Sequence, residues 1–184
     1  RITIGENDFV SQTTYRRFLY VAAHEFVHLW NVKRIRPKVL GPFDYSREVH
    51  TRALWMSEGV TSYYADLLML RTGVYTQPDF LANEAANINT LQHAPGRRLM
   101  SAGEASWNTW LQSDNADNNA ISYYIKGEII GLLLDLEIRA RTENRKSLDD
   151  VMRYLMEHYA SKGAGFPEDG LLQAIEAVAG SDFH

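Results

Sequence analysis

Apolar side chains recur at intervals of three and four residues along most of this 184-residue chain, and the two-residue alternation of a half-buried strand is weak throughout. A chain with this pattern buries its apolar faces by packing helix against helix. We therefore expect an all-α fold of about six helices, with little or no sheet and at most one short strand in residues 1–5. The length suits one domain of roughly 100 to 200 residues, and no repeat or linker divides residues 1–184.

Turn and capping residues set the expected bounds of these helices. Pro37 is expected to end the first helix, and Gly73 the second. Ser147, with Asp150 three residues later, predicts a capped start for the fifth. Residues 101–117 are expected to form a loop with one short turn. The expected helices are 13–35, about 53–71, the segment between Pro78 and Pro95, 118 or 119 to about 141, 147 to about 161, and 167 to just before Gly180.

The fourth expected helix carries a stripe of large apolar residues that predicts a central place in the core. The stripe consists of Ile121, Ile125, Ile129, Leu132, Leu133 and Leu136.

The composition excludes several classes of function. Apolar residues make up 45% of the sequence and charged residues 23%, which is typical of a soluble globular protein. The net charge of -4 argues against a nucleic-acid partner. The absence of cysteine excludes disulfides, thiolate metal sites and cysteine nucleophiles. No apolar run reaches the roughly 18 residues of a transmembrane helix, so we expect no membrane-spanning segment.

Residues 24–28 read His-Glu-Phe-Val-His and match the His-Glu-x-x-His pattern of zinc sites, within a segment whose periodicity is helical. Residues four apart on a helix lie on one face with Cβ atoms about 5 to 6 Å apart, so both imidazoles can bind one metal ion. Glu25 lies about 100° round the helix from His24, where its carboxylate can reach a metal-bound water. We therefore expect His24 and His28 to be zinc ligands and Glu25 to be the catalytic base.

A catalytic zinc ion takes three protein ligands and keeps a fourth position open for water. Glu58 is the favoured third ligand, because it interrupts an otherwise apolar segment of the next helix and is costly to bury unpaired. Asp66 lies two turns further along the same helix, and Glu48 and His50 lie in a loop that positions them less firmly. These three residues stay open as alternatives.

Three ordered blocks of the sequence carry a family resemblance: HEFVHLWNVKRIRP at 24–37, LWMSEGVTSYY at 54–64 and ISYYIKGEIIGLLLDLEIR at 121–139. These blocks resemble the glycyl aminopeptidase family of zinc metallopeptidases, part of the gluzincin group, in which the third ligand is a glutamate on a following helix. The resemblance covers about a quarter of the chain and is far more specific than His-Glu-x-x-His alone. It implies a thermolysin-like helical catalytic subdomain, zinc as the cofactor, His24, His28 and Glu58 as its ligands, and Glu25 as the base.

The third block adds a further catalytic residue. Tyr124-Ile125-Lys126-Gly127 is similar to the Tyr-Glu-Lys-Gly segment of related aminopeptidases, whose tyrosine stabilises the oxyanion, although Ile125 replaces the glutamate. The resemblance therefore implies that Tyr124 is the oxyanion donor, while the adjacent Tyr123 points elsewhere on the helix. Relatives also carry a β-rich amino-terminal region that binds the substrate amine, and commonly a carboxy-terminal PDZ domain. Since this sequence has neither, we expect it to be a fragment of a longer protein.

These observations predict a zinc-dependent peptidase that hydrolyses peptide substrates with a metal-activated water. The resemblance implies an aminopeptidase that prefers small amino-terminal residues such as Gly. A zinc endopeptidase, or a non-catalytic peptide-binding module that retains the fold, stays open as an alternative. The presence of Glu25 beside all three candidate ligands is typical of an active enzyme. The sequence predicts neither an oligomeric state nor a cellular location.

Overall fold

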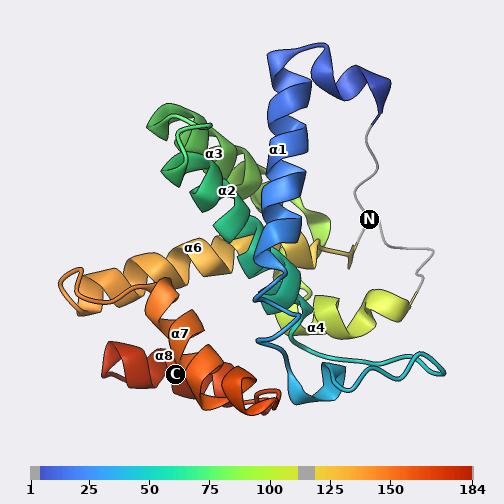
Figure 1. Ribbon diagram of the computed structural model, residues 1–184. Helices are drawn as coiled ribbons and strands as arrows, with labels where there is room; N and C mark the ends of the chain where they lie inside the picture. Colours follow the sequence, from blue (N-terminus) through green and yellow to red (C-terminus); the bar gives the residue numbers. More distant parts are fainter. Residues whose placement is uncertain (1–4, 112–118, 184) are drawn as a thin grey trace.

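The computed structural model describes residues 5–111 and 119–183. Within these residues it contains seven α-helices and no strand, with isolated β-bridges between Asn31 and Ile35 and between Pro37 and Phe166. The all-α expectation is confirmed, whereas the strand expected in residues 1–5 lies almost wholly outside the described residues. The α-helices (Figure 1) are α1 (Gln12–Val27), α2 (Thr61–Arg71), α3 (Gln77–His93), α4 (Ala102–Trp107), α6 (Tyr123–Arg141), α7 (Leu148–His158) and α8 (Gly170–Ala179).

Shorter helical turns connect these elements. One of them, η3 (Trp55–Val60), is a π-helix that runs directly into α2. The others are 3-10 helices: η1 (Glu6–Phe9), η2 (Lys38–Leu40), η4 (Pro95–Arg98), η5 (Asn108–Trp110) and η6 (Ala160–Lys162).

The helices pack as two groups that share α6. In Figure 1, α1, α2 and α3 stand above α6, and the paired helices α7 and α8 lie below it. The core cluster combines buried residues from η3, α2, α3, α6, α7 and α8, including Met56, Val60, Ile138, Val151 and Leu155. Among the described residues, no helix is long and apolar enough to cross a bilayer.

The first helix is shorter than its periodicity predicted. α1 ends at Val27, with His28 as its carboxy-terminal cap, and residues 28–35 form successive turns instead of continuing to residue 35. Asn31 is completely buried in these turns, and its side-chain amide donates to the carbonyl of Met56 across 2.9 Å. This tertiary hydrogen bond competes with continuation of the helix, so the chain turns well before Pro37.

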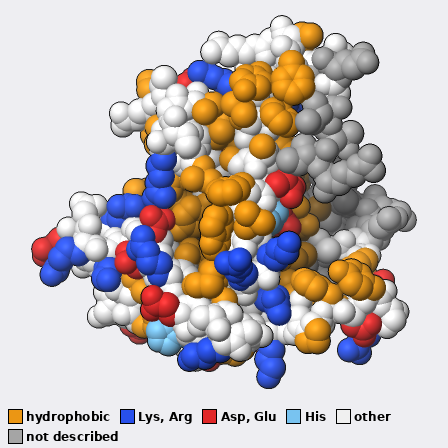
Figure 2. Space-filling view, viewed as in Figure 1, with side chains coloured by type: hydrophobic (Ala, Val, Ile, Leu, Met, Phe, Trp, Pro, Cys, Tyr) orange, Lys and Arg blue, Asp and Glu red, His pale blue; other side chains and the backbone are white. Residues whose placement is uncertain are grey.

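The first helix also leaves much of its apolar face exposed. Phe26 is 51% exposed and Trp30, just beyond the helix, is 41% exposed. Figure 2 shows hydrophobic side chains gathered over α1 on this face of the molecule. The periodic residues of 13–35 therefore do not all belong to the core of the described part of the chain.

The second expected helix spans the residues predicted for it, but its first part is π-helical. A close backbone crossing with α6 accompanies this irregularity. A Cβ atom added to Gly59 would lie 2.5 Å from the Cα of Gly127, and one added to Gly127 would lie 2.3 Å from the carbonyl oxygen of Trp55. Only glycine at both positions permits this approach, which brings α6 directly against η3.

The fourth expected helix begins later and buries a different face than predicted. α6 starts at Tyr123, with the Ser122 side chain accepting from the backbone N–H of Ile125, rather than at residue 118 or 119. Ile121 and Ile129 are buried and Leu132 packs against the core, but Leu133 and Leu136 are 58% and 54% exposed, so the predicted stripe is wrong at these two positions. The close approach to η3 turns the small and acidic residues of α6 inward: Gly127, Glu128, Gly131 and Asp135.

Three more expectations concern helix ends. The segment 101–117 was expected to be a loop, but it contains α4, because Ser101 and Glu104 form a capping box at the start of that helix. Residues 112–118 lie outside the described part of the chain. The predicted capping of α7 by Ser147 and Asp150 is confirmed. α3 also occupies the segment predicted for it, and α8 begins at Gly170, three residues after the Pro167 predicted.

Candidate metal centre and active site

The end of α1 and the π-helix η3 bring three of the predicted site residues to one point. The Oε2 atom of Glu58 lies 3.2 Å from the Nε2 atom of His24 and 3.2 Å from the Nε2 atom of His28. The two imidazole rings stand edge to face with centroids 4.7 Å apart. Two imidazole nitrogens and one carboxylate oxygen are a donor set that suits a catalytic zinc ion.

The three alternative ligands lie elsewhere. Asp66 is buried in a separate cluster of carboxylates with Glu84 and Glu128. Glu48 and His50 lie 3.4 Å apart, and the Nδ1 atom of His50 is 3.0 Å from the carbonyl of Trp107. The structure therefore gathers Glu58, and none of the alternatives, with the two histidines.

The hydrogen bonds made by the Nδ1 atom of each imidazole determine whether the Nε2 atom that faces Glu58 carries a hydrogen. The Nδ1–H of His28 donates to the carbonyl of Asn31 across 2.7 Å. The Ser62 hydroxyl donates to the backbone carbonyl of Glu58, so its oxygen can accept from the Nδ1–H of His24 at 3.4 Å. A neutral imidazole has one N–H, so both Nε2 atoms then face Glu58 as hydrogen-bond acceptors. Three acceptors that converge in this way fit a bound cation.

Electrostatics keeps Glu58 ionised. Burial alone raises the pKa of its carboxyl, but when no metal is bound and the imidazoles carry protons on Nε2, the hydrogen bonds and charge of His24 and His28 outweigh burial and hold the pKa at about 2. The hydrogen bond to Glu58 raises the pKa of His28 in turn. The side chains are partly exposed, at 13% for His24 and 23% for the other two, so the site is accessible to a ligand.

Asn31 is a site residue that sequence reasoning missed. Its carbonyl holds His28, and its buried amide donates to the carbonyl of Met56 and to the Thr61 hydroxyl. One residue thus ties the segment after α1 to both ends of η3. The signal available in the sequence was a helix-disfavouring Asn three residues after the second histidine.

The two predicted catalytic residues flank this cluster. Glu25 is exposed on α1, outside the three-residue cluster, and its charge contributes to the raised pKa of His28. Tyr124, in the first turn of α6, stacks on His24 with ring centroids 6.2 Å apart. Burial and the adjacent charge of Glu58 raise the pKa of Tyr124. Tyr123 stacks on the outer side of Tyr124, 4.9 Å away.

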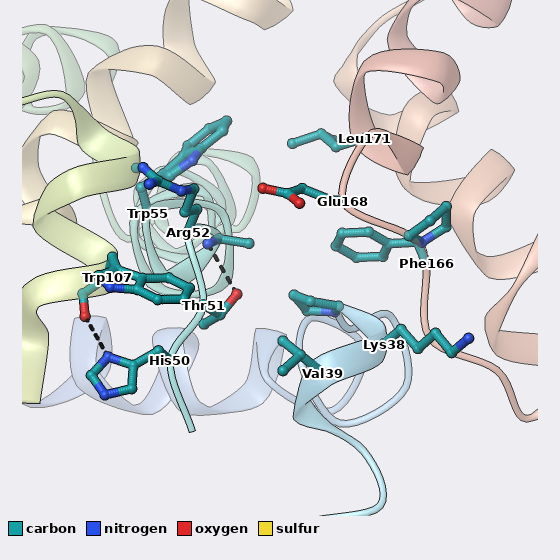
Figure 3. Close-up of a pocket in the computed structure, with 14 residues that line it drawn as sticks. Lys38, Val39, His50, Thr51, Arg52, Trp55, Trp107, Phe166, Glu168 and Leu171 are labelled. Atoms are coloured by element: carbon teal, nitrogen blue, oxygen red, sulfur yellow. Dashed lines mark hydrogen bonds between the residues drawn. The ribbon is translucent and has the colours of Figure 1, made fainter. Parts of the chain in front are cut away.

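Two hollows lie near these elements. A cleft of about 620 Å³ is lined by Tyr124, Ser62 and Glu128, among others, and so borders the cluster. A larger cavity of about 750 Å³ is drawn in Figure 3, where Trp107 and His50 face Phe166 and Leu171. None of His24, His28 and Glu58 lines that cavity. The candidate metal ligands therefore lie away from the larger of these two hollows.

Residues 17–130 match the sequence model of the M61 glycyl aminopeptidase family. The chain belongs to this family. The matched range contains both histidines, Glu25, Glu58 and Tyr124. No curated protein sequence matches the chain.

The fold agrees with this membership. The chain is similar to a crystal structure described as an aminopeptidase N family protein from Idiomarina loihiensis, with a TM-score of 0.82 and 28% sequence identity. The match covers 94% of this chain and 29% of that chain. The M61 chain described here therefore spans under a third of the length of that protein.

Proposed function

We propose that this M61 chain is the catalytic domain of a zinc-dependent aminopeptidase that prefers small amino-terminal residues such as Gly. The observation that carries the proposal is the convergence of the two imidazoles on the Glu58 carboxylate. Each Nε2 atom lies 3.2 Å from the same Oε2 atom. Such a set of acceptors supports a bound zinc ion with one open position. The family membership supports peptide bonds as the substrate and peptides as the partner.

The residues of the chain divide the work of hydrolysis between them. His24, His28 and Glu58 hold the zinc ion, which when bound supplies a Lewis acid and an activated water. Glu25 accepts the proton of the attacking water and passes it to the leaving amine. Tyr124 donates its phenolic hydrogen to the oxygen that becomes negative as the carbonyl is attacked.

The preference for a free amino terminus rests on the family, because no group in the three-residue cluster selects it. Residues 1–184 form a single domain in this proposal, and substrate-binding parts belong to the rest of a longer protein. A zinc endopeptidase remains the second reading of the same centre, and a module that binds peptides without cleaving them is the third.

Replacement of Glu25 by Gln tests the base. The variant keeps all three candidate ligands, so we expect it to retain about one zinc per chain while kcat for peptide hydrolysis falls roughly 10²- to 10⁴-fold. Zinc is measured by elemental analysis and turnover by release of the amino-terminal residue. Glu157→Gln, at an exposed position of α7, is the matched control and leaves both values unchanged. Near-normal turnover in Glu25→Gln would refute the base assignment.

Replacement of Tyr124 by Phe tests the oxyanion donor. The ring and its stacking on His24 remain, but the hydroxyl is lost, so kcat is expected to fall on the order of 10²- to 10³-fold with little change in zinc content. Tyr123→Phe removes the neighbouring hydroxyl and is expected to retain wild-type kcat. A loss of kcat in Tyr123→Phe with wild-type kcat in Tyr124→Phe would mean that the similarity to the Tyr-Glu-Lys-Gly segment identified the wrong tyrosine.

Acetylation of the substrate distinguishes an aminopeptidase from an endopeptidase. In a longer protein that carries the proposed substrate-binding parts, we expect a peptide with a free amino-terminal Gly to be cleaved and its N-acetyl form to be cleaved at least about 100-fold more slowly, because an ion pair to the amine is lost. Comparable cleavage of both peptides would favour the endopeptidase. Absence of cleavage of either peptide, with zinc bound, would favour the peptide-binding module.

A further inference from the structure

Three carboxylates from three helices meet in the interior beside the candidate metal centre. They are Asp66 of α2, Glu84 of α3 and Glu128 of α6, which are 3%, 4% and 4% exposed. Each offers an oxygen, and these oxygens all lie within 4.8 Å of one another. Buried acidic groups are rare unless a cation or a hydrogen-bond donor compensates them.

The protein supplies little of that compensation. None of the three carboxylates forms an ion pair within residues 5–111 and 119–183. Both carboxylate oxygens of Glu84 and one of Asp66 are buried without a hydrogen-bond partner. Glu128 accepts one hydrogen bond, 2.8 Å long, from the amide of Asn87. Glu84 is therefore an unpartnered side chain, almost entirely buried, whose acceptor atoms lie in the cluster.

Burial and mutual repulsion raise the pKa values of the carboxyl groups in this cluster. Burial and the neighbouring Asp66 raise the pKa of Glu84 to about 7, and the same two causes, with the charge of Glu84 added, raise that of Glu128 to about 9. Protons on these groups are one way to lower the cost of burial, and a protonated Glu128 can donate to Asp66, but both oxygens of Glu84 have no hydrogen-bond partner. A cation bound among the three carboxylates satisfies all of these oxygens at once.

We propose that Asp66, Glu84 and Glu128 form a second cation site, separate from the candidate zinc centre, which takes Ca²⁺. The donors are all oxygens, which hard cations prefer, whereas zinc favours the imidazole-containing set. Ca²⁺ binds oxygen at about 2.3 to 2.6 Å, so its ligands lie up to roughly 5 Å apart across the ion, in agreement with the spacing here. Asp66 and Glu128 line the cleft of about 620 Å³, which provides an entry path and room for water ligands.

A cation at this place braces the helices that carry the active site. Glu128 lies one helical turn after Tyr124, and Asp66 lies two turns after Glu58. Through Glu84, the ion would also hold α3, a helix that carries no candidate active-site residue. The site fixes α2 and α6 relative to each other without contacting the substrate, so its role is structural, and its existence does not depend on the proposed peptidase activity.

Calcium and terbium binding to the zinc-loaded protein test the proposal. At a concentration 100-fold above its Kd, Ca²⁺ is expected to raise Tm by roughly 5 to 10 °C. Tb³⁺, which replaces Ca²⁺ at oxygen sites, is expected to luminesce on tyrosine excitation, because Tyr20 and Tyr75 line the same cleft. Glu84→Gln is expected to abolish both signals, whereas Glu157→Gln on the exposed face of α7 retains them.

Several results would overturn this site. If millimolar Ca²⁺ does not raise Tm and millimolar Tb³⁺ does not luminesce in the wild-type protein, protons alone compensate the buried carboxylates. Signals that persist in Glu84→Gln would place the ion elsewhere. If that variant does not fold, Asp66→Asn and Glu128→Gln carry the same expectation. An anomalous-scattering peak of Tb³⁺ between the three carboxylates in crystals locates the ion without any substitution, and its absence from terbium-soaked crystals contradicts the proposal.

Discussion

The arrangement of this domain depends on three hydrogen-bond acceptors that face one another at one point. The Nε2 atoms of His24 and His28 each lie 3.2 Å from the same oxygen of Glu58. Each ring is oriented by a hydrogen bond on its other side, to the carbonyl of Asn31 or toward the Ser62 hydroxyl. Acceptors at this distance repel unless a proton or a metal ion lies between them. The proposed zinc chemistry follows from that requirement.

The surrounding fold can be understood as support for this point. The chain turns directly after His28, and buried Asn31 links the turn to the π-helix that carries Glu58. π-helical segments often occur at functional sites, where they re-aim side chains. Gly59 and Gly127 let α6 approach η3 at backbone distance, which places Tyr124 against His24. The ligand-bearing segments and the candidate oxyanion donor are thus held by separate, specific contacts.

Much of this could be predicted from the sequence, because the relevant signals are local. Helical periodicity predicts an all-α fold, and the four-residue spacing of His24 and His28 predicts that both face one ion. The end of α1 could not be predicted, because it depends on a hydrogen bond from Asn31 to a residue 25 positions away. The exposed Leu133 and Leu136 were misplaced for a similar reason, since a glycine contact, not the leucine stripe, orients α6.

The acidic residues show the same limit within the site. Asp66 could be proposed only as a rival zinc ligand, because its proximity to Glu84 and Glu128 arises from the packing of three helices that are distant in sequence. Glu58, the acid that interrupts an apolar segment after the His-Glu-x-x-His motif, is the candidate that lies beside both histidines. A motif thus identifies residues that share one helix, whereas sites assembled from several helices become visible only in the fold.

Metal content is the most direct test of the central claim. Elemental analysis of the purified protein, after dialysis against metal-free buffer, is compared with that of Glu58→Ala and of Asp66→Asn. The account predicts about one zinc per chain in the wild-type protein and in Asp66→Asn, and a large loss in Glu58→Ala, because two imidazoles alone hold the ion weakly. Equal zinc loading in the wild-type protein and Glu58→Ala would contradict it.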